Sequence, residues 1–83
     1  MMAAETFGQR LKRLRESTGL SQHKLADLAG VPIGTLRGAE YDRREPKITT
    51  AAKIADALGV TLDVLAGRGI EPAPETPKRR GKK

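Results

Sequence analysis

Positive side chains gather in two short stretches of this 83-residue chain. Arg43, Arg44 and Lys47 lie within five positions, and Pro46 disfavours helix at the residue before it, so this group belongs to a loop. The segment 71–83 holds five Lys and Arg against two Glu, a net +3 within a formal net charge of +6 for the whole chain. Guanidinium and ammonium groups bind phosphates and carboxylates, and the charge balance therefore indicates an anionic partner such as nucleic acid or an acidic surface.

Catalytic and metal-binding chemistry finds little support in the residue types. The chain has one histidine, His23, and no cysteine, and its carboxylates are scattered. We therefore expect no enzyme activity, no metal site and no cofactor. The lack of cysteine is compatible with a reducing cytoplasm, and no apolar run approaches the roughly 18 residues that cross a bilayer. We expect a cytoplasmic protein that does not contact membranes.

The stretch 20–40 contains the elements that would position a binding surface. Ser21 is a good N-cap, and Leu25, Leu28 and Ala29 recur at helical spacing, which predicts a helix of about two turns with these three side chains facing inward. Gly30 follows the last periodic residue, where a left-handed C-cap is least costly. The first helix of the stretch is expected to end there.

A second short helix follows almost at once. Pro32 fits the first position of a helix, and Leu36 and Ala39 give that helix an inward edge. Two helices joined by a short turn with glycine form the helix-turn-helix arrangement.

Two glycines are unusual within the second of these helices. Gly34 and Gly38 each cost about 1 kcal/mol relative to alanine, and their spacing places them on one face. Either the helix backbone approaches a partner closely there, or the positions carry little demand. Ala39 is small for a core position, so this part of the core is expected to be either looser or filled by a neighbour such as Tyr41.

The flanking segments predict three further helices in a compact all-α bundle. Thr6 caps a first helix from Phe7 to about Thr18, a fourth helix runs from about Thr49 to Leu58, and a fifth from about Leu62 to Ala66. The length allows one domain, which we place at residues 6–67 after a flexible lead-in at 1–5. Residues 68–83 contain three prolines and little to bury, so we expect a disordered basic tail.

Several motifs occur in an order that resembles the Cro/C1-type (XRE-like) helix-turn-helix repressors. They are Leu20-Ser21-Gln22, Leu25-Ala26, Ala29-Gly30-Val31, Thr35-Leu36, Glu40, Arg43-Arg44-Glu45-Pro46 and Ala57-Leu58-Gly59-Val60. The resemblance covers about residues 7–67. It implies a five-helix fold of the lambda-repressor-like type. It also implies that the protein is a transcriptional regulator, a repressor, which binds a specific double-stranded DNA sequence as a homodimer.

The resemblance also assigns roles to residues. In such a domain the second helix of the motif enters the major groove and the first abuts the DNA backbone. The implied base-reading residues are Ile33, Gly34, Thr35, Arg37 and Gly38, and the implied phosphate-contacting residues are Gln22, His23, Tyr41, Arg43, Arg44 and Lys47. Arg37 is the one strong base-edge donor, able to contact guanine with two hydrogen bonds.

Other implied roles are structural. The family pairs an arginine of the first helix with a glutamate of the third, here Arg15 and Glu40. Asp42 stands where many members have glycine, and we expect it to adopt the same left-handed conformation. The family commonly forms dimers through its last two helices, so Leu62, Val64 and Ile70 are either an exposed apolar seam or part of the monomer core.

Two other functions stay open at this point. The chain can be an antitoxin-like module that binds a protein partner through its tail, which folds on contact, while the helix-turn-helix binds its own promoter. It can also bind nucleic acid without sequence preference, and steep salt dependence would then mark its binding.

Overall fold

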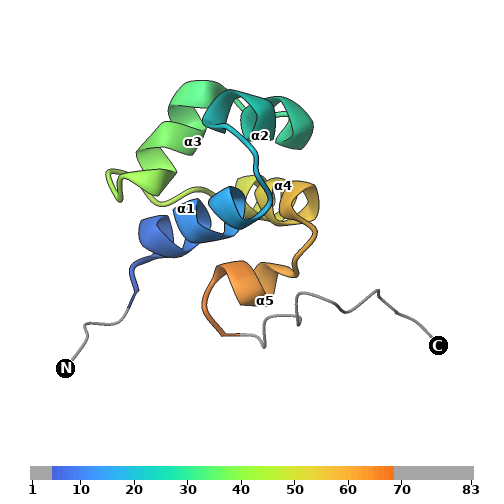
Figure 1. The fold of residues 1–83 in the computed structure, drawn as a ribbon. Coiled ribbons are helices and arrows are strands. Elements are labelled where there is room, and N and C mark those ends of the chain that lie inside the picture. The colour runs from blue at the N-terminus through green and yellow to red at the C-terminus, as the bar shows by residue number, and fades with distance from the viewer. Residues whose placement is uncertain (1–4, 69–83) are drawn as a thin grey trace.

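The computed structural model describes residues 5–68 and contains five α helices, with no strand among these residues (Figure 1). The all-α prediction is confirmed. The helices are α1 (Phe7–Ser17), α2 (Gln22–Ala29), α3 (Ile33–Glu40), α4 (Ile48–Leu58) and α5 (Leu62–Leu65). Residues 69–83 of the predicted tail and the first four residues of the predicted lead-in lie outside the described residues.

Side-chain caps fix where three of the helices begin. The Thr6 hydroxyl accepts the Gln9 N–H at 3.0 Å, and the Gln9 side chain in turn accepts the Thr6 N–H at 2.9 Å, which forms a capping box. Ser21 and Thr61 cap α2 and α5 in the same way, each by accepting the N–H three residues later. These caps satisfy backbone donors that have no partner inside the helix.

Several predicted boundaries shift by one residue. Pro32 is the N-cap of α3 and not its first helical residue, because its ψ of 144° is extended. Similarly, α4 begins at Ile48 rather than Thr49, after Lys47 in an extended conformation. At the other ends, Thr18 is the C-cap of α1 and Ala66 the C-cap of α5.

Each helix contributes one large, fully buried side chain to a single core. These residues are Leu11, Leu25, Leu36, Ile54 and Leu65. Burying a side chain of this size stabilises the fold by about 1.5–3 kcal/mol. The core therefore depends on all five helices, including the four-residue α5.

Two predictions about core residues are wrong. Leu28 is 56% exposed, because the buried stripe of α2 passes through Leu25, Ala26 and Ala29 instead. Tyr41 is 52% exposed and does not fill the space beside Ala39, which is itself buried. The main chain of α1 at Gly8 approaches Ala39 closely, so a small residue suffices there.

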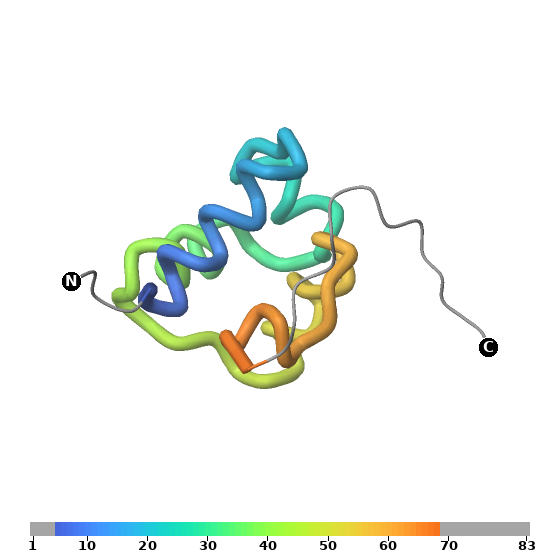
Figure 2. Tube along the Cα trace, turned by 60° about the horizontal axis from the view of Figure 1, so that its bottom comes forward, coloured from blue at the N-terminus to red at the C-terminus, as the bar shows by residue number. Residues whose placement is uncertain are grey.

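The arrangement leaves one face of the α2–α3 pair free. Figure 1 shows α2 and α3 together on one side of the domain, with α1 and α4 beneath them and α5 below those. In the core, α1 packs against α3 and α4 packs against α2. Figure 2 shows the loop 41–47 running along the edge of the domain from α3 to α4.

Candidate nucleic-acid interface

The turn between α2 and α3 is short, and its backbone N–H groups form hydrogen bonds to the end of α2. Gly30 adopts a left-handed conformation with φ 71°, and its N–H donates to carbonyls of the last turn of α2. The Val31 N–H donates to the Ala26 carbonyl at 3.0 Å. Three residues therefore suffice to end one helix and begin the next, which is the helix-turn-helix arrangement that the sequence predicted.

The outer face of α3 is nearly bare. Gly34, Thr35 and Arg37 are exposed and Gly38 is half-buried. A Cβ placed on Gly34 or Gly38 would meet no atom within 4 Å, so the fold itself does not require glycine at either position. Ile33, also predicted to read bases, is half-buried and packs against the core. Arg37 is therefore the longest polar side chain on this face.

An open hollow lies between this face and the loop after α3. It is lined by Pro32, Gly34, Thr35, Arg37, Gly38, Arg43, Arg44 and Pro46. None of these lining residues is acidic, and three carry guanidinium groups. Concave surfaces lined by one sign of charge attract the opposite charge, so the hollow favours an anion.

The loop is attached to the end of α3 by its main chain. The N–H groups of Arg43 and Arg44 donate to the Gly38 carbonyl at 2.9 and 3.4 Å. The Arg43 guanidinium lies 5.4 Å from the centre of the Tyr41 ring, within the range of a cation–π contact. Lys47, at the far end of the loop, is exposed. The predicted phosphate-contacting residues of this loop are thus on one accessible edge.

Asp42 joins the same loop to the start of α1. It has φ 58°, so the expected left-handed conformation is confirmed. Its carboxylate accepts the Thr6 hydroxyl at 2.6 Å and the Gly8 N–H at 2.9 Å. The hydrogen bond from Thr6, followed by that from the Gly8 main chain, lowers the pKa of Asp42 below its usual 3.8. The left-handed residue thus also supplies an anion to the N-terminus of α1.

The Arg15–Glu40 ion pair is present and buried. Arg15 Nε lies 2.6 Å from Glu40 Oε2, and Arg15 Nη2 lies 3.2 Å from Oε1, which is the two-bond geometry of a guanidinium fork on a carboxylate. The Glu40 side chain is fully buried and that of Arg15 is 10% exposed. Arg15 Nη1 also donates to the Leu20 carbonyl at 2.8 Å. The pair ties α1 to the end of α3 and to Leu20, which precedes the N-cap of α2.

Gln22 joins this pair at the start of α2. Its Nε2 donates to Glu40 Oε1 at 3.0 Å, and its Oε1 accepts from Arg37 Nε at 3.4 Å. His23 beside it is exposed. Both residues were predicted to contact phosphate, but the Gln22 side chain has protein partners on both of its polar atoms.

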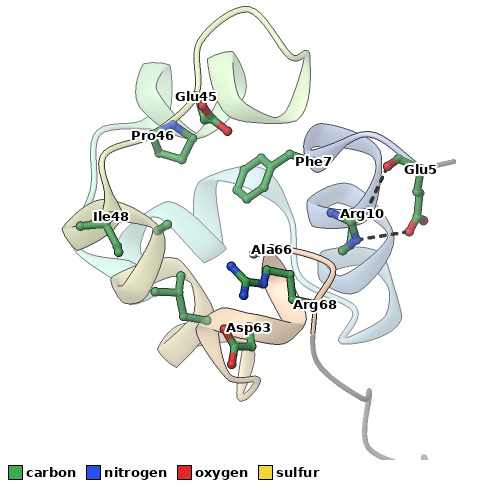
Figure 3. A pocket seen from close by; sticks show the side chains of 11 residues that line it. Glu5, Phe7, Arg10, Glu45, Pro46, Ile48, Asp63, Ala66 and Arg68 are labelled. Atoms are coloured by element: carbon green, nitrogen blue, oxygen red, sulfur yellow. Dashed lines mark hydrogen bonds and ion pairs between the residues drawn. The ribbon is translucent and has the colours of Figure 1, made fainter.

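The predicted dimer seam divides between core and surface. Val64 is 3% exposed and belongs to the monomer core, which is the second of the two expectations for these residues. Leu62 is half-buried and lines a groove formed by α1, α4 and α5, which Figure 3 shows. Phe7 and Ile48 add apolar surface to this groove, and Ile48 is 71% exposed. Ile70 lies outside the described residues.

Three of these hydrogen bonds could not be predicted from the sequence. The bonds from Asp42 to Thr6 and Gly8 join residues more than 30 positions apart, and the only local sign was an acidic residue where glycine is usual. The bond between Gln22 and Arg37 had no local sign.

Across residues 5–68, no group of His, Asp and Glu side chains is arranged to hold a metal ion. No helix in this range is long and apolar enough to span a bilayer.

Comparisons with known proteins agree with this geometry. Residues 11–65 match the family model described as Helix-turn-helix (HTH_3). The HTH-type transcriptional regulator YonR, derived from the SPbeta prophage of Bacillus subtilis (strain 168), is 39% identical over 59 residues, which cover 71% of this chain and 55% of YonR. The chain spans about half the length of YonR and of the immunity repressor protein of Bacillus phage phi105, another curated relative.

Two solved structures have the same fold. The restriction-modification controller protein C.AhdI from Aeromonas hydrophila is 39% identical with a TM-score of 0.69, and the match covers 71% of this chain and 89% of C.AhdI. SinR, the master regulator for biofilm formation, was solved in complex with DNA; it is 33% identical with a TM-score of 0.69, over 72% of this chain and 97% of that one. The family predicted from the motifs is confirmed, and the chain belongs to the Cro/C1-type (XRE-like) helix-turn-helix family of DNA-binding transcriptional regulators.

Proposed function

We propose that this protein regulates transcription by binding a specific double-stranded DNA sequence, with α3 in the major groove and Arg37 reading a base. The observation that carries the proposal is the outer face of α3, where Arg37 stands between two glycines beside a loop of positive charge. An α-helix with its side chains is about 10–12 Å across, which fits the roughly 12 Å width of the major groove.

The glycines allow the α3 backbone to come close to the base edges. Open space surrounds Gly34 and Gly38, so the surface of the helix there is the main chain itself. Arg37 then projects beyond its neighbours, with Thr35 and the exposed edge of Ile33 beside it. In this arrangement Arg37 contacts guanine with two hydrogen bonds, which discriminates against other bases by about 1–3 kcal/mol.

Phosphate contacts come from both ends of the α2–α3 pair. Arg43, Arg44, Lys47 and Tyr41 are exposed along the loop. At the start of α2, the main-chain N–H groups of Gln22 and His23 and the helix dipole favour a phosphate. These contacts position the domain without reading sequence.

The wider role is that of a repressor acting as a homodimer on an inverted repeat. Half-sites about one helical turn apart suit a two-fold symmetric pair of such domains. Because Val64 is buried, the pairing surface is Leu62 together with its groove neighbours Phe7 and Ile48. The naming of YonR as a transcriptional regulator and the structure of SinR with DNA support a DNA-binding role for this chain.

Selection of bound duplexes from a random DNA library tests the proposal. The intact protein, Arg37→Ala and the control Lys53→Ala, which removes one exposed charge from α4, are compared at near-physiological salt. We expect an inverted repeat with a guanine preference that weakens in Arg37→Ala and persists in Lys53→Ala. Recovery of no motif, with binding that disappears as salt rises, would show non-specific binding instead.

A further inference from the structure

The direction of the Gln22 side-chain amide is fixed by a buried charge. Glu40 is an ionised carboxylate paired with Arg15, so its oxygens only accept hydrogen bonds. The group that Gln22 presents to Glu40 at 3.0 Å must therefore be its NH₂. The amide oxygen then points away from Glu40, and it lies 3.4 Å from Arg37 Nε. An amide turned the other way would place oxygen against oxygen and lose both bonds.

Within residues 5–68, no residue of α3 forms a hydrogen bond with the Arg37 side chain. The residue three positions before it is Gly34 and the next residue is Gly38, neither of which has a side chain to pack against it. Within residues 5–68, the bond to Gln22 is the one hydrogen bond that the structure gives the Arg37 side chain. It engages Nε and leaves both Nη groups without a hydrogen bond among residues 5–68, and these are the groups that would contact guanine O6 and N7 in an end-on contact.

We propose that Gln22 is a positioning residue for base reading: it holds the Arg37 guanidinium in one orientation, and the buried Arg15–Glu40 pair sets the direction in which Gln22 does so. An arginine side chain loses rotamer entropy when it binds, and restricting it before binding reduces that loss. The inference rests on the proposed function. It separates the side chain of Gln22, which supports a base contact, from its main-chain N–H, which faces phosphate.

The test uses Gln22→Met, which keeps the length of the side chain and removes both hydrogen bonds. We compare its affinity for the selected duplex with that for the same duplex in which the Arg37-dependent guanine pair is replaced by adenine–thymine. We expect discrimination between the two to fall about 2- to 10-fold, as for the loss of one hydrogen bond. In an Arg37→Ala background the same change should have no effect on discrimination.

A matched control is His23→Met, the same new side chain one position later. We expect it to weaken binding to both duplexes equally, because an exposed residue at the start of α2 contacts the backbone and not a base. If Gln22→Met behaves like His23→Met, with equal loss on both duplexes, then the side chain acts on phosphate and the inference is wrong. Thermal melts of each variant show that binding is measured on folded protein.

A measurement without DNA separates this inference from the proposed function. The ¹⁵N relaxation of arginine Nε–H groups should show Arg37 more ordered than Arg44 in the intact protein, and equally mobile in Gln22→Met. Unchanged Arg37 mobility would overturn the inference even if DNA selection succeeds. Failure of the selection would overturn base reading itself, while the relaxation data would still show whether Gln22 holds Arg37.

Discussion

The two faces of α3 differ in how much space they leave for a side chain at a glycine. On the inner face, a Cβ at Gly8 of α1 would meet the main-chain oxygens of Ala39 and Glu40, so no side chain fits. On the outer face, Gly34 and Gly38 are surrounded by open space. Glycine is thus required by packing on one face and not on the other. The fold does not explain the glycines of the outer face, each of which costs about 1 kcal/mol relative to alanine, and the proposed close approach to DNA would explain them.

Arg15→Met should have the largest effect on stability, because it removes one partner of the buried ion pair on the inner face of α3. Glu40 would then lie buried without its main partner, which costs about 3–5 kcal/mol in the free energy of unfolding. Urea denaturation measures this loss. The double variant Arg15→Met, Glu40→Leu should recover most of it, since no charge is then left buried. A double variant as unstable as the single one would contradict this account.

Gly8→Ala tests the packing requirement of the inner face. The new methyl group must displace main chain at the end of α3 and the Asp42 carboxylate, which should cost about 1–3 kcal/mol despite the better helix propensity of alanine. The midpoint of urea unfolding gives the measurement. An increase in stability would mean that α1 and α3 separate easily, and the comparison between the two faces would fail.

Gly34→Ala and Gly38→Ala test the outer face and should raise stability, whereas Gly8→Ala should lower it. Each should stabilise the free protein by about 1 kcal/mol, because alanine favours helix and meets no neighbour. If α3 approaches DNA closely, each should also weaken binding to the selected duplex. Thermal melts and binding titrations on the same samples give both quantities. Alanine variants that bind as tightly as the intact protein would show that close approach does not explain these glycines.

Asp42→Asn should have the smallest effect, and its effect should depend on pH. The pKa of Asp42 is lowered in the folded state, so its carboxylate stabilises the fold above the unfolded pKa of about 3.8, and this contribution is lost as pH falls through the lower, folded value. The intact protein should therefore be more stable than Asp42→Asn at pH 7, and the difference should disappear in strong acid. Urea unfolding at several pH values measures it; a difference that grows in acid would contradict the assignment.

Local rules account for what the sequence predicted well. Thr6, Ser21 and Thr61 each begin a helix by accepting a hydrogen bond from the N–H three residues later. Gly30 and Gly59 each end a helix by adopting a left-handed conformation. Each of these signals lies within a few residues of sequence. The same local reasoning failed at Leu28. Its spacing fits the inward stripe, but only the packing of α2 against α4 decides which edge of that stripe is covered.

The parts of the site that could not be predicted are bonds between distant residues. Nothing near Gly8 in the sequence indicates that the end of α3 lies against it. The direction of the Gln22 amide depends on a carboxylate 18 positions away, which is itself fixed by Arg15. The Arg15–Glu40 pair was predicted through the family resemblance, because periodicity alone does not match one helix to another.

The core that takes one large side chain from each helix also sets how this protein responds to heat. The eight residues of α3 are too few to form a stable helix alone, and the four residues of α5 hold Leu65 in the same core as Leu36. If any one helix melts, the others lose part of their packing, so the proposed DNA-binding surface exists only while the whole domain is folded. A variant with a weakened core should therefore lose the proposed DNA binding abruptly at its own melting temperature.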